Sequence, residues 1–360
     1  MYKDNRIGVV VTAYDEATFV GRVIETVPEY VDRIYAVDDR SPDESWEVIQ
    51  RVAERINRKR DRETAELELT VADGGDDRRV VPIRHEQNRG YGAAVKTGYR
   101  RAAADGLDVV AVMNGDGQMD PAILDRIIDP VVTGDADYAK GNRLLSPEDR
   151  DDMSTFRFIG NVMLTGLSKF ATGYWSIGDT QNGYTAISRD AIEALDLEEI
   201  TDRYGFLNHI LTHLNVAGRR VADVPMYAVY GDEKSSIRYA SFINFVSRLL
   251  LRSFCWRLKT RYVVQSFNPA VVYYGAGTIG LLGGFVGLLG SVARAVEGKD
   301  GFISGVSSFV AALIGLVSLC TAIRLDAEAS EELTVSGADW DDERSPAVDD
   351  DDSAVDQSIE

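Results

Sequence analysis

Two long uncharged segments near the carboxyl end constrain this chain more than any other feature of its sequence. No Asp, Glu, Lys or Arg occurs at residues 262–293 or at residues 301–323. Each segment is longer than the ~20 residues that a helix needs to cross a bilayer, and both are rich in Gly, Val, Leu and Ala. We therefore predict a hairpin of two membrane-spanning helices within residues 263–324. A pair of helices buried in a protein core is the alternative.

Residues 239–262, just before the first span, have the pattern of an amphipathic helix at a membrane interface. Arg248, Arg252 and Lys259 are spaced by four and seven residues, so they share one helical face. A soluble helix packed on a sheet is the alternative. Five basic residues in this region outnumber the two in the hairpin link, so the positive-inside rule predicts a multi-pass cell-membrane protein with its domain and tail in the cytoplasm. The apolar stripe of this helix is Phe242, Ile243, Phe245, Val246, Leu249, Leu250 and Phe254.

The net charge of −19 argues against nucleic-acid binding, which needs clustered Lys and Arg. Residues 325–360 hold 14 acidic residues and one basic residue, and we predict a disordered acidic tail there. Only 8 of the 39 basic residues are Lys. An acid-rich, lysine-poor surface suits a salt-rich cytoplasm, as in a halophilic archaeon; an ordinary acidic protein is the alternative. Two Cys and three His are too few for a disulfide framework or a His-rich metal cluster.

Residues 1–238 alternate between strand-like and helix-like patterns. We expect strands at 7–12, 33–37, 80–84, 108–113 and 138–140, and helices at 18–28, 43–57, 90–104 and 121–132. The polar stretch 60–78 is expected to be a variable surface excursion. This rhythm predicts an α/β domain with a mostly parallel sheet covered by helices on both faces.

Polar side chains follow three of these strands at the points where they end. They are residues 14–16 after the first strand, 38–41 after the second and 114–118 after the fourth. Loops of this kind are polar in general, so one such cluster alone would mean little. Because ligands of parallel sheets bind beyond the carboxyl ends of the strands, three clusters at one edge predict a binding site there.

The segment 114–118 offers the oxygen ligands that Mg²⁺ or Mn²⁺ prefers. Asn114, Asp116 and Gln118 alternate with Gly115 and Gly117, which leave room for a diphosphate to approach the backbone. A metal ion held there would neutralise the charge that builds on a departing nucleotide diphosphate.

The other two clusters suit a nucleoside. Asp39 and Glu16 can accept hydrogen bonds from a base or a ribose, and Tyr14 can pack against a base. The segment 88–92 opens a helix, whose N-terminus favours anions. Its Gly-x-Gly is a poor match to a dinucleotide-binding loop because it follows the third strand and lacks the third Gly.

Three further basic residues are candidates for phosphate contacts. Arg143 and Arg157 can bind a phosphate bidentately, and Lys234 offers a point charge to a diphosphate. Surface ion pairs are the alternative for each of them. His209 and His213 lie four residues apart with no carboxylate to complete a metal site, so we interpret them as packing or surface residues.

In this order the segments resemble family 2 glycosyltransferases of the GT-A fold, especially dolichol-phosphate mannose synthases and related polyprenyl-phosphate hexosyltransferases. The resemblance implies a Rossmann-like domain with nucleotide contacts at Tyr14, Glu16, Val37 and Asp39. The segments that carry it are VVVTAYDE (9–16), AVDDRSPDES (36–45), NRGYGAAVKTGY (88–99), VMNGDGQMDP (112–121), KGNR (140–143), DTQNGY (179–184) and VPMYAVYGDEK (224–234).

The same resemblance implies further roles. Arg143 is placed as the phosphate-binding Arg of the family, and Arg157 as its second acceptor-phosphate Arg. Four positions depart from the family pattern. Thr12 in the donor site stands in place of Pro, Asn114 in place of the first metal-binding Asp, Ala228 in place of an Arg of mannose synthases, and Asn182 in place of a Ser before a Gly. The metal motif falls on Asn114, Asp116 and Gln118, and the donor-binding set also includes Gly115 and Lys234.

The reaction that the resemblance implies is inverting transfer of a hexose from a UDP- or GDP-linked sugar to dolichyl or polyprenyl phosphate. A phosphate acceptor is largely ionised near pH 7 and needs no general base. A sugar hydroxyl would need one, and Asp179 is then the first candidate. One alternative is a transferase that acts on a lipid-linked sugar or sugar lipid. Another is a catalytically silent, membrane-anchored binding module.

Overall fold

The computed structural model describes residues 1–66, 78–144, 155–203, 205–226 and 239–335. These residues form one sheet with the strand order β3-β2-β1-β4-β6-β5-β7-β8. Strand β6 runs antiparallel to β4 and β5, and the other neighbouring pairs are parallel. The strands are β1 (Ile7–Ala13), β2 (Arg33–Asp38), β3 (Val80–Arg84), β4 (Val109–Asn114), β5 (Tyr138–Asn142), β6 (Thr185–Ser188), β7 (Val221–Pro225) and β8 (Thr334–Val335).

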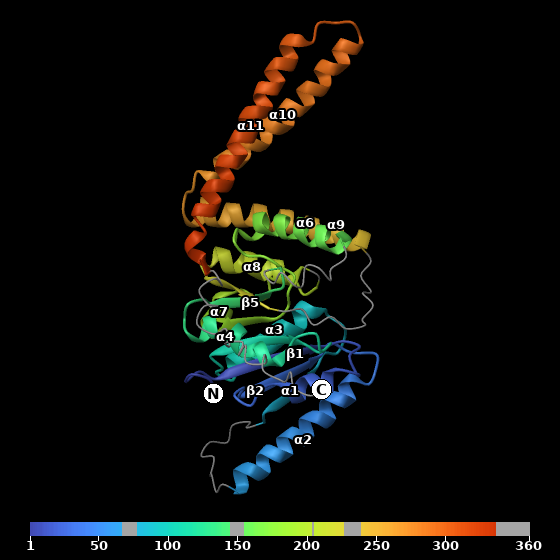
Figure 1. The fold of residues 1–360 in the computed structure, drawn as a ribbon, viewed down its shortest axis with the longest axis vertical. Coiled ribbons are helices and arrows are strands. Elements are labelled where there is room, and N and C mark those ends of the chain that lie inside the picture. Colours follow the sequence, from blue (N-terminus) through green and yellow to red (C-terminus); the bar gives the residue numbers. More distant parts are fainter. Residues whose placement is uncertain (67–77, 145–154, 204, 227–238, 336–360) are drawn as a thin grey trace, which may run out of the picture.

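Helices cover both faces of the sheet, and the side chains of β1 show how the layers are divided. Val9 and Val11 pack into a core with α1, α2 and α4, whereas Val10 packs into the opposite core with α3, α7 and α8. The predicted α/β fold with a mostly parallel sheet is therefore confirmed (Figure 1). The helices are α1 (Val20–Thr26), α2 (Ser45–Glu66), α3 (Tyr91–Ala104), α4 (Leu124–Val132) after the 3₁₀ turn η1 (Pro121–Ile123), α7 (Arg189–Ala194) and α8 (Phe206–Val216).

Helix α2 is longer than the sequence pattern predicts. The expected helix ends at residue 57, but α2 continues to Glu66, so the first part of the polar stretch 60–78 is helical rather than an irregular excursion. Its sequence there holds no Gly or Pro, and Arg58 pairs with Glu54 one turn earlier. The rest of that stretch up to residue 77 lies outside the described residues.

Two long helices lie side by side between the sheet domain and the hairpin (Figure 1). They are α6 (Thr155–Thr172) and α9 (Tyr239–Lys259), and α9 continues into the π-helical turn η2 (Thr260–Gln265). Part of the apolar stripe of α9 packs on α6, since Val246 and Leu250 are buried against Ala171. The outward face of α9 still exposes Phe245 and Leu251.

The basic residues of this region divide into two groups. Arg248, Arg252 and Lys259 are exposed, as their common helical face predicts. Arg257 is wholly buried, and Arg261 donates hydrogen bonds to Ser330 Oγ and to the carbonyl of Ala329. The basic face available to a membrane is therefore made of three residues rather than five.

Helices α10 (Ala270–Val296) and α11 (Phe302–Glu328) form a long hairpin that extends away from the domain (Figure 1). Glycine allows their backbones to meet, because a Cβ on Gly280 would lie only 2.8 Å from the Cα of Gly315. Both helices are long and apolar enough to cross a membrane, and few of their residues are buried inside the protein. They are not the buried core helices that were the alternative.

The first part of the segment that we expected to be a disordered tail is ordered. Helix α11 runs to Glu328, the 3₁₀ turn η3 (Glu331–Leu333) follows, and β8 then pairs with β7 at the edge of the sheet. The prediction of disorder from residue 325 was therefore wrong for residues 325–335. The physical reason is that the acidic side chain of Asp326 is neutralised inside the protein by Arg257. Residues 336–360 lie outside the described residues.

His209 and His213 of α8 serve packing, as expected from the sequence. The ring of His213 stacks on Trp256 of α9 with centroids 4.4 Å apart, and His209 packs edge-on against His213. Burial lowers the pKa of each imidazole to about 4, because the charged form is poorly solvated there.

We expect acid to destabilise the protein through these two histidines. Between pH 6.5 and pH 4 the unfolded chain binds protons that the folded state excludes, so the free energy of unfolding falls as the pH falls. The expected loss between pH 7 and pH 5 is about 1 kcal/mol per histidine, after allowance for partial exposure. Denaturant titrations at both pH values measure it. A His209→Gln/His213→Phe variant should lose less stability than the parent, and an equal loss would contradict the assignment.

Candidate active site

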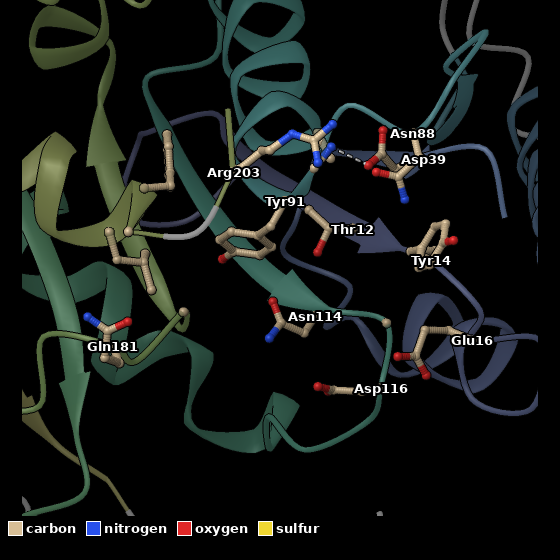
Figure 2. A pocket seen from close by; sticks show the side chains of 18 residues that line it. Thr12, Tyr14, Glu16, Asp39, Asn88, Tyr91, Asn114, Asp116, Gln181 and Arg203 are labelled. Atoms are coloured by element: carbon tan, nitrogen blue, oxygen red, sulfur yellow. Dashed lines mark hydrogen bonds between the residues drawn. The ribbon is translucent and has the colours of Figure 1, made fainter. Parts of the chain in front are cut away.

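A cavity of about 570 Å³ opens where β1, β2 and β4 end and where α3 and α8 begin (Figure 2). This is the edge at which the sequence predicts a binding site. The residues of the predicted site that line the cavity are Thr12, Tyr14, Glu16, Asp39, Asn114, Gly115 and Asp116. The structure therefore brings together the polar clusters that follow three separate strands.

Asp39 is held rigidly at the wall of the cavity. Its Oδ1 accepts a hydrogen bond from the backbone N–H of Arg89 (2.9 Å) and lies 2.7 Å from His85 Nδ1. Its Oδ2 accepts from the N–H of Gly90 (2.6 Å). The other ring nitrogen of His85 lies 2.9 Å from Thr97 Oγ1. These contacts fix the carboxylate between β2 and α3, facing the cavity.

Asp116 projects into the cavity from the loop after β4 (Figure 2). Its Oδ1 accepts a hydrogen bond from the N–H of Gln118 (3.0 Å), and Gly117 takes the left-handed conformation that this turn requires (φ +76°). Burial raises the pKa of Asp116 above its ordinary value, since the charged form is partly desolvated. A positively charged partner would therefore stabilise the ionised form of this carboxylate.

The side-chain oxygens of this loop are suitable ligands for a hard divalent cation such as Mg²⁺. Asn114 Oδ1 is buried and has no hydrogen-bond partner among the described residues, and it lines the same cavity as Asp116. No group of three His, Cys, Asp or Glu that could form a complete protein cage occurs in the described residues. One carboxylate and one amide oxygen suit Mg²⁺ or Mn²⁺, which take oxygen ligands and accept substrate phosphates in the remaining positions.

Arg143 and Asp179 bind each other beside the cavity, and neither belongs to the described residues that line it. Arg143 Nε and Nη2 donate to the two carboxylate oxygens of Asp179 over 2.7 and 2.9 Å. Although burial raises the pKa of Asp179, the hydrogen bonds and charge of Arg143 outweigh it and hold that pKa below its ordinary value. Asp179 therefore stays ionised, and both of its carboxylate oxygens are hydrogen-bonded to Arg143. This arrangement does not favour a role as general base.

Four other residues expected at the site are placed as follows. Val37 is wholly buried in the core between β2 and α3, so its side chain does not reach the cavity. The backbone N–H of Gln118 donates a hydrogen bond to Oδ1 of Asp116. Arg157 belongs to α6, but its side chain lies outside the described residues, as does the whole of Lys234.

The structure adds residues that the sequence patterns did not single out, among them Asn88, Tyr91, Gln181 and Arg203 (Figure 2). The Tyr91 ring packs edge-on against Phe206 with centroids 6.0 Å apart. The hydroxyl of Tyr91 and the Nε2 of Gln181 are buried and make no hydrogen bond among the described residues, so both are available to a ligand. Asn88 and Tyr91 belong to the segment 88–92 and Gln181 to the segment 179–184, both of which were already noted from the sequence. Arg203 is an isolated basic residue outside every noted segment, so no sequence pattern pointed to it.

The chain is similar to known sugar transferases. A family model described as Glycosyl transferase family 2 matches residues 8–196, more than half of the chain. The UDP-N-acetylglucosamine–dolichyl-phosphate N-acetylglucosaminyltransferase of Methanococcus voltae is 25% identical over 63% of this chain and 87% of that protein. The dolichol-phosphate mannosyltransferase of Pyrococcus furiosus is 24% identical over 72% of this chain and 67% of that protein. A solved structure of glucosyl-3-phosphoglycerate synthase from Mycobacterium tuberculosis covers 71% of this chain and 80% of its own, with 16% identity and a TM-score of 0.49.

Proposed function

The chain belongs to glycosyl transferase family 2, and from this premise we propose that it transfers a hexose from a nucleotide-sugar to dolichyl or another polyprenyl phosphate. The observation that carries the proposal is the cavity that combines Tyr14, Asp39 and Asp116 at one sheet edge, in a chain with two bilayer-length helices. In the reaction a phosphate oxygen of the lipid bonds to the anomeric carbon, the bond from that carbon to the nucleotide diphosphate breaks, and the diphosphate leaves. Relatives named for dolichyl-phosphate substrates support this choice of acceptor.

The donor nucleoside is proposed to bind between Tyr14 and Asp39. Tyr14 is 49% exposed, so its ring is free to pack against a base, and Asp39 can accept hydrogen bonds from a base N–H or a ribose hydroxyl. Thr12 and Glu16 also line the cavity. The unpaired polar atoms of Tyr91 and Gln181 can then bind hydroxyl groups of the sugar.

Asp116 and Asn114, with Gln118 beside them, are the residues that would hold Mg²⁺ or Mn²⁺. When bound, such an ion supplies positive charge to the departing diphosphate. Gly115 lets the backbone of this loop lie close to β1, since a Cβ there would come within 2.9 Å of the carbonyl oxygen of Thr12.

The acceptor phosphate is already nucleophilic near pH 7, so the protein needs to position it and balance its charge rather than remove a proton. Arg143 and Arg157 are proposed for this role, and Asp179 orients the guanidinium of Arg143 through its two hydrogen bonds. The exposed face of α9 would lie at the bilayer surface, with the hairpin crossing the membrane and the domain in the cytoplasm.

A single assay tests the proposal. Full-length protein in detergent is incubated with dolichyl phosphate, MgCl₂ and a panel of UDP- and GDP-sugars, and the lipid products are analysed by mass spectrometry. We expect one lipid-phosphate-linked hexose, equimolar release of the nucleoside diphosphate, and loss of both with EDTA. Transfer only to a lipid-linked sugar would favour the alternative acceptor, and nucleotide binding without any transfer would favour a silent binding module.

A further inference from the structure

Lys140 of β5 is a buried lysine that does not line the cavity. Its side chain is 1% exposed, and all five residues of β5 are buried. The ammonium donates hydrogen bonds to the carbonyls of Gly141 (2.9 Å) and Gly178 (2.8 Å), and it pairs with Asp223 of β7 over 3.2 Å. Apolar side chains of similar volume often stabilise a buried position as well as an ion pair does, because they avoid the loss of hydration. The pair is therefore better explained by what it holds in place than by stability.

The lysine and its aspartate hold one residue, Gly178, by both its N–H and its carbonyl. The N–H donates to Asp223 Oδ2 over 2.9 Å, and the carbonyl accepts from Lys140. Asn142 Nδ2 donates to the same Oδ2 over 2.5 Å, so both carboxylate oxygens have partners. A Cβ on Gly178 would lie only 2.5 Å from Asn142 Nδ2, so the backbone packs directly on this network. Gly178 is thereby fixed against β5 and β7.

The residue after Gly178 begins a strained turn. Asp179 takes a left-handed φ of +34°, which is costly for a residue other than Gly and persists only where the surrounding structure enforces it. Its carboxylate binds Arg143 through both oxygens, and its carbonyl accepts from the N–H of Asn182 over 3.0 Å. The fixed position of Gly178 is therefore part of what keeps Asp179 in place against Arg143.

The same turn forms a wall of the cavity. Gln181 and Gly183 line it, and Figure 2 shows Gln181 at the opposite side of the cavity from Tyr14. A Cβ on Gly183 would lie 2.8 Å from the hydroxyl of Tyr91 and 3.4 Å from Asn114 Oδ1. The turn thus lies directly against the two buried polar atoms that have no partner among the described residues at this end of the cavity. A shift of Gly178 would move this wall relative to the metal-binding loop.

We propose that Lys140 and Asp223 are positioning residues for the transfer reaction, an inference that deepens the proposed function and rests on it. They touch no substrate and act through Gly178, which sets the turn that carries Gln181 at the cavity and Asp179 against Arg143. Since a displacement of about 1 Å at a reacting site can lower a rate by about 10²-fold, the pair controls the rate of transfer. The affinity for the donor nucleoside depends instead on the loops after β1 and β2, which the pair does not contact.

The test uses neutral double variants of the full-length protein in detergent, because they leave no charge buried. Lys140→Met/Asp223→Asn should lower kcat for transfer to a short-chain prenyl phosphate by about 10- to 100-fold. The Kd for UDP or GDP, whichever the parent binds, should stay within about twofold in titration calorimetry with Mg²⁺. Lys140→Gln/Asp223→Asn, which keeps a hydrogen-bond donor on the side chain, should retain more of the rate. Hydrogen exchange in the peptide that covers residues 178–183 should be faster in the Met variant than in the parent.

Lys3→Met/Asp129→Asn is the matched control. Lys3 pairs with the buried Asp129 over 2.8 Å, and neither residue lines the cavity, so the same chemical change there should leave both kcat and the exchange of residues 178–183 as in the parent. Cooperative thermal transitions above the assay temperature verify that all three variants are folded.

A kcat within about threefold of the parent in the folded Met variant, an equal loss of nucleotide affinity, or unchanged exchange in residues 178–183 would overturn the proposal. Failure of the proposed function gives a different result, since the parent itself would then transfer no sugar to the prenyl phosphate. In that case the exchange measurement still decides whether the pair holds the turn.

Discussion

Replacing Asp116 with Asn is expected to lower the rate of sugar transfer by about 10³-fold without loss of the fold. Asn keeps the Oδ1 that accepts from the N–H of Gln118, so the turn after β4 is retained. The negative charge that attracts a divalent ion is lost, and electrostatic stabilisation of a leaving group is worth about 10²- to 10³-fold or more when one contributor is removed. Because burial raises the pKa of Asp116, its charge is unfavourable in the folded state, and the thermal midpoint of the variant should be unchanged or higher.

Initial rates at saturating donor and acceptor, together with nucleotide titrations in the presence and absence of Mg²⁺, measure this effect. The parent protein should bind nucleotide more tightly with Mg²⁺, and Asp116→Asn should lose that difference. Asp135→Asn is the matched control, since Asp135 is exposed in the turn after α4. Activity of Asp116→Asn within tenfold of the parent, or a similar loss in the control, would remove this carboxylate from the site.

The second large effect is expected at the junction of the hairpin and the domain. Arg257 and Asp326 are both wholly buried, and Arg257 Nη1 and Nη2 donate to the two carboxylate oxygens of Asp326 over 2.8 Å each. Arg257 also donates to the carbonyls of Phe170 and Ala171 in α6, and the hydroxyl of Tyr262 donates to Asp326. Asp326→Asn leaves a buried guanidinium uncompensated, which should cost about 3 to 5 kcal/mol of folding free energy.

Glu328→Gln provides a control on the same helix. Glu328 forms an exposed pair with Arg324 one turn earlier, and such pairs contribute little. Chemical denaturation in detergent, monitored by tryptophan fluorescence, compares the two variants with the parent. A double variant Arg257→Met/Asp326→Leu should recover only part of the loss, because the apolar pair leaves no charge buried but removes the partners of the Phe170 and Ala171 carbonyls and of the Tyr262 hydroxyl. Equal stability of Asp326→Asn and Glu328→Gln would show that the buried pair does not hold the junction together.

Much of the domain followed from short-range patterns in the sequence. The apolar runs of β1 and β4 end at Tyr14 and at Asn114, and this change from apolar to polar residues located both the sheet and the edge that carries the cavity. The resemblance to family 2 glycosyltransferases, based on ordered segments within residues 9–234, is confirmed by the family match over residues 8–196. The two long helices of the hairpin could be predicted because an uncharged apolar stretch of that length forms few other structures.

The features that were missed depend on partners far apart in the chain. Composition predicted disorder from residue 325, but Asp326 is ordered by Arg257, 69 residues earlier. His85 holds Asp39, and Arg143 holds Asp179, through pairs that no local pattern reveals. In each case a polar residue received its partner only when the fold brought two distant segments together, so propensity and periodicity carried no signal for it.

The short strand β8 has a consequence for the order in which this protein is made. It adds the last strand to the sheet, yet the ribosome reaches it only after both helices of the hairpin have been synthesised. The sheet therefore stays incomplete, and Arg257 lacks its carboxylate, until the chain has passed through α10 and α11. Since the polypeptide leaves the domain at α9 and rejoins it at β8, both ends of the hairpin must emerge on the same face of any bilayer that it crosses. Synthesis of the hairpin therefore precedes completion of the sheet, and a chain whose synthesis stops within the hairpin lacks the strand that completes it.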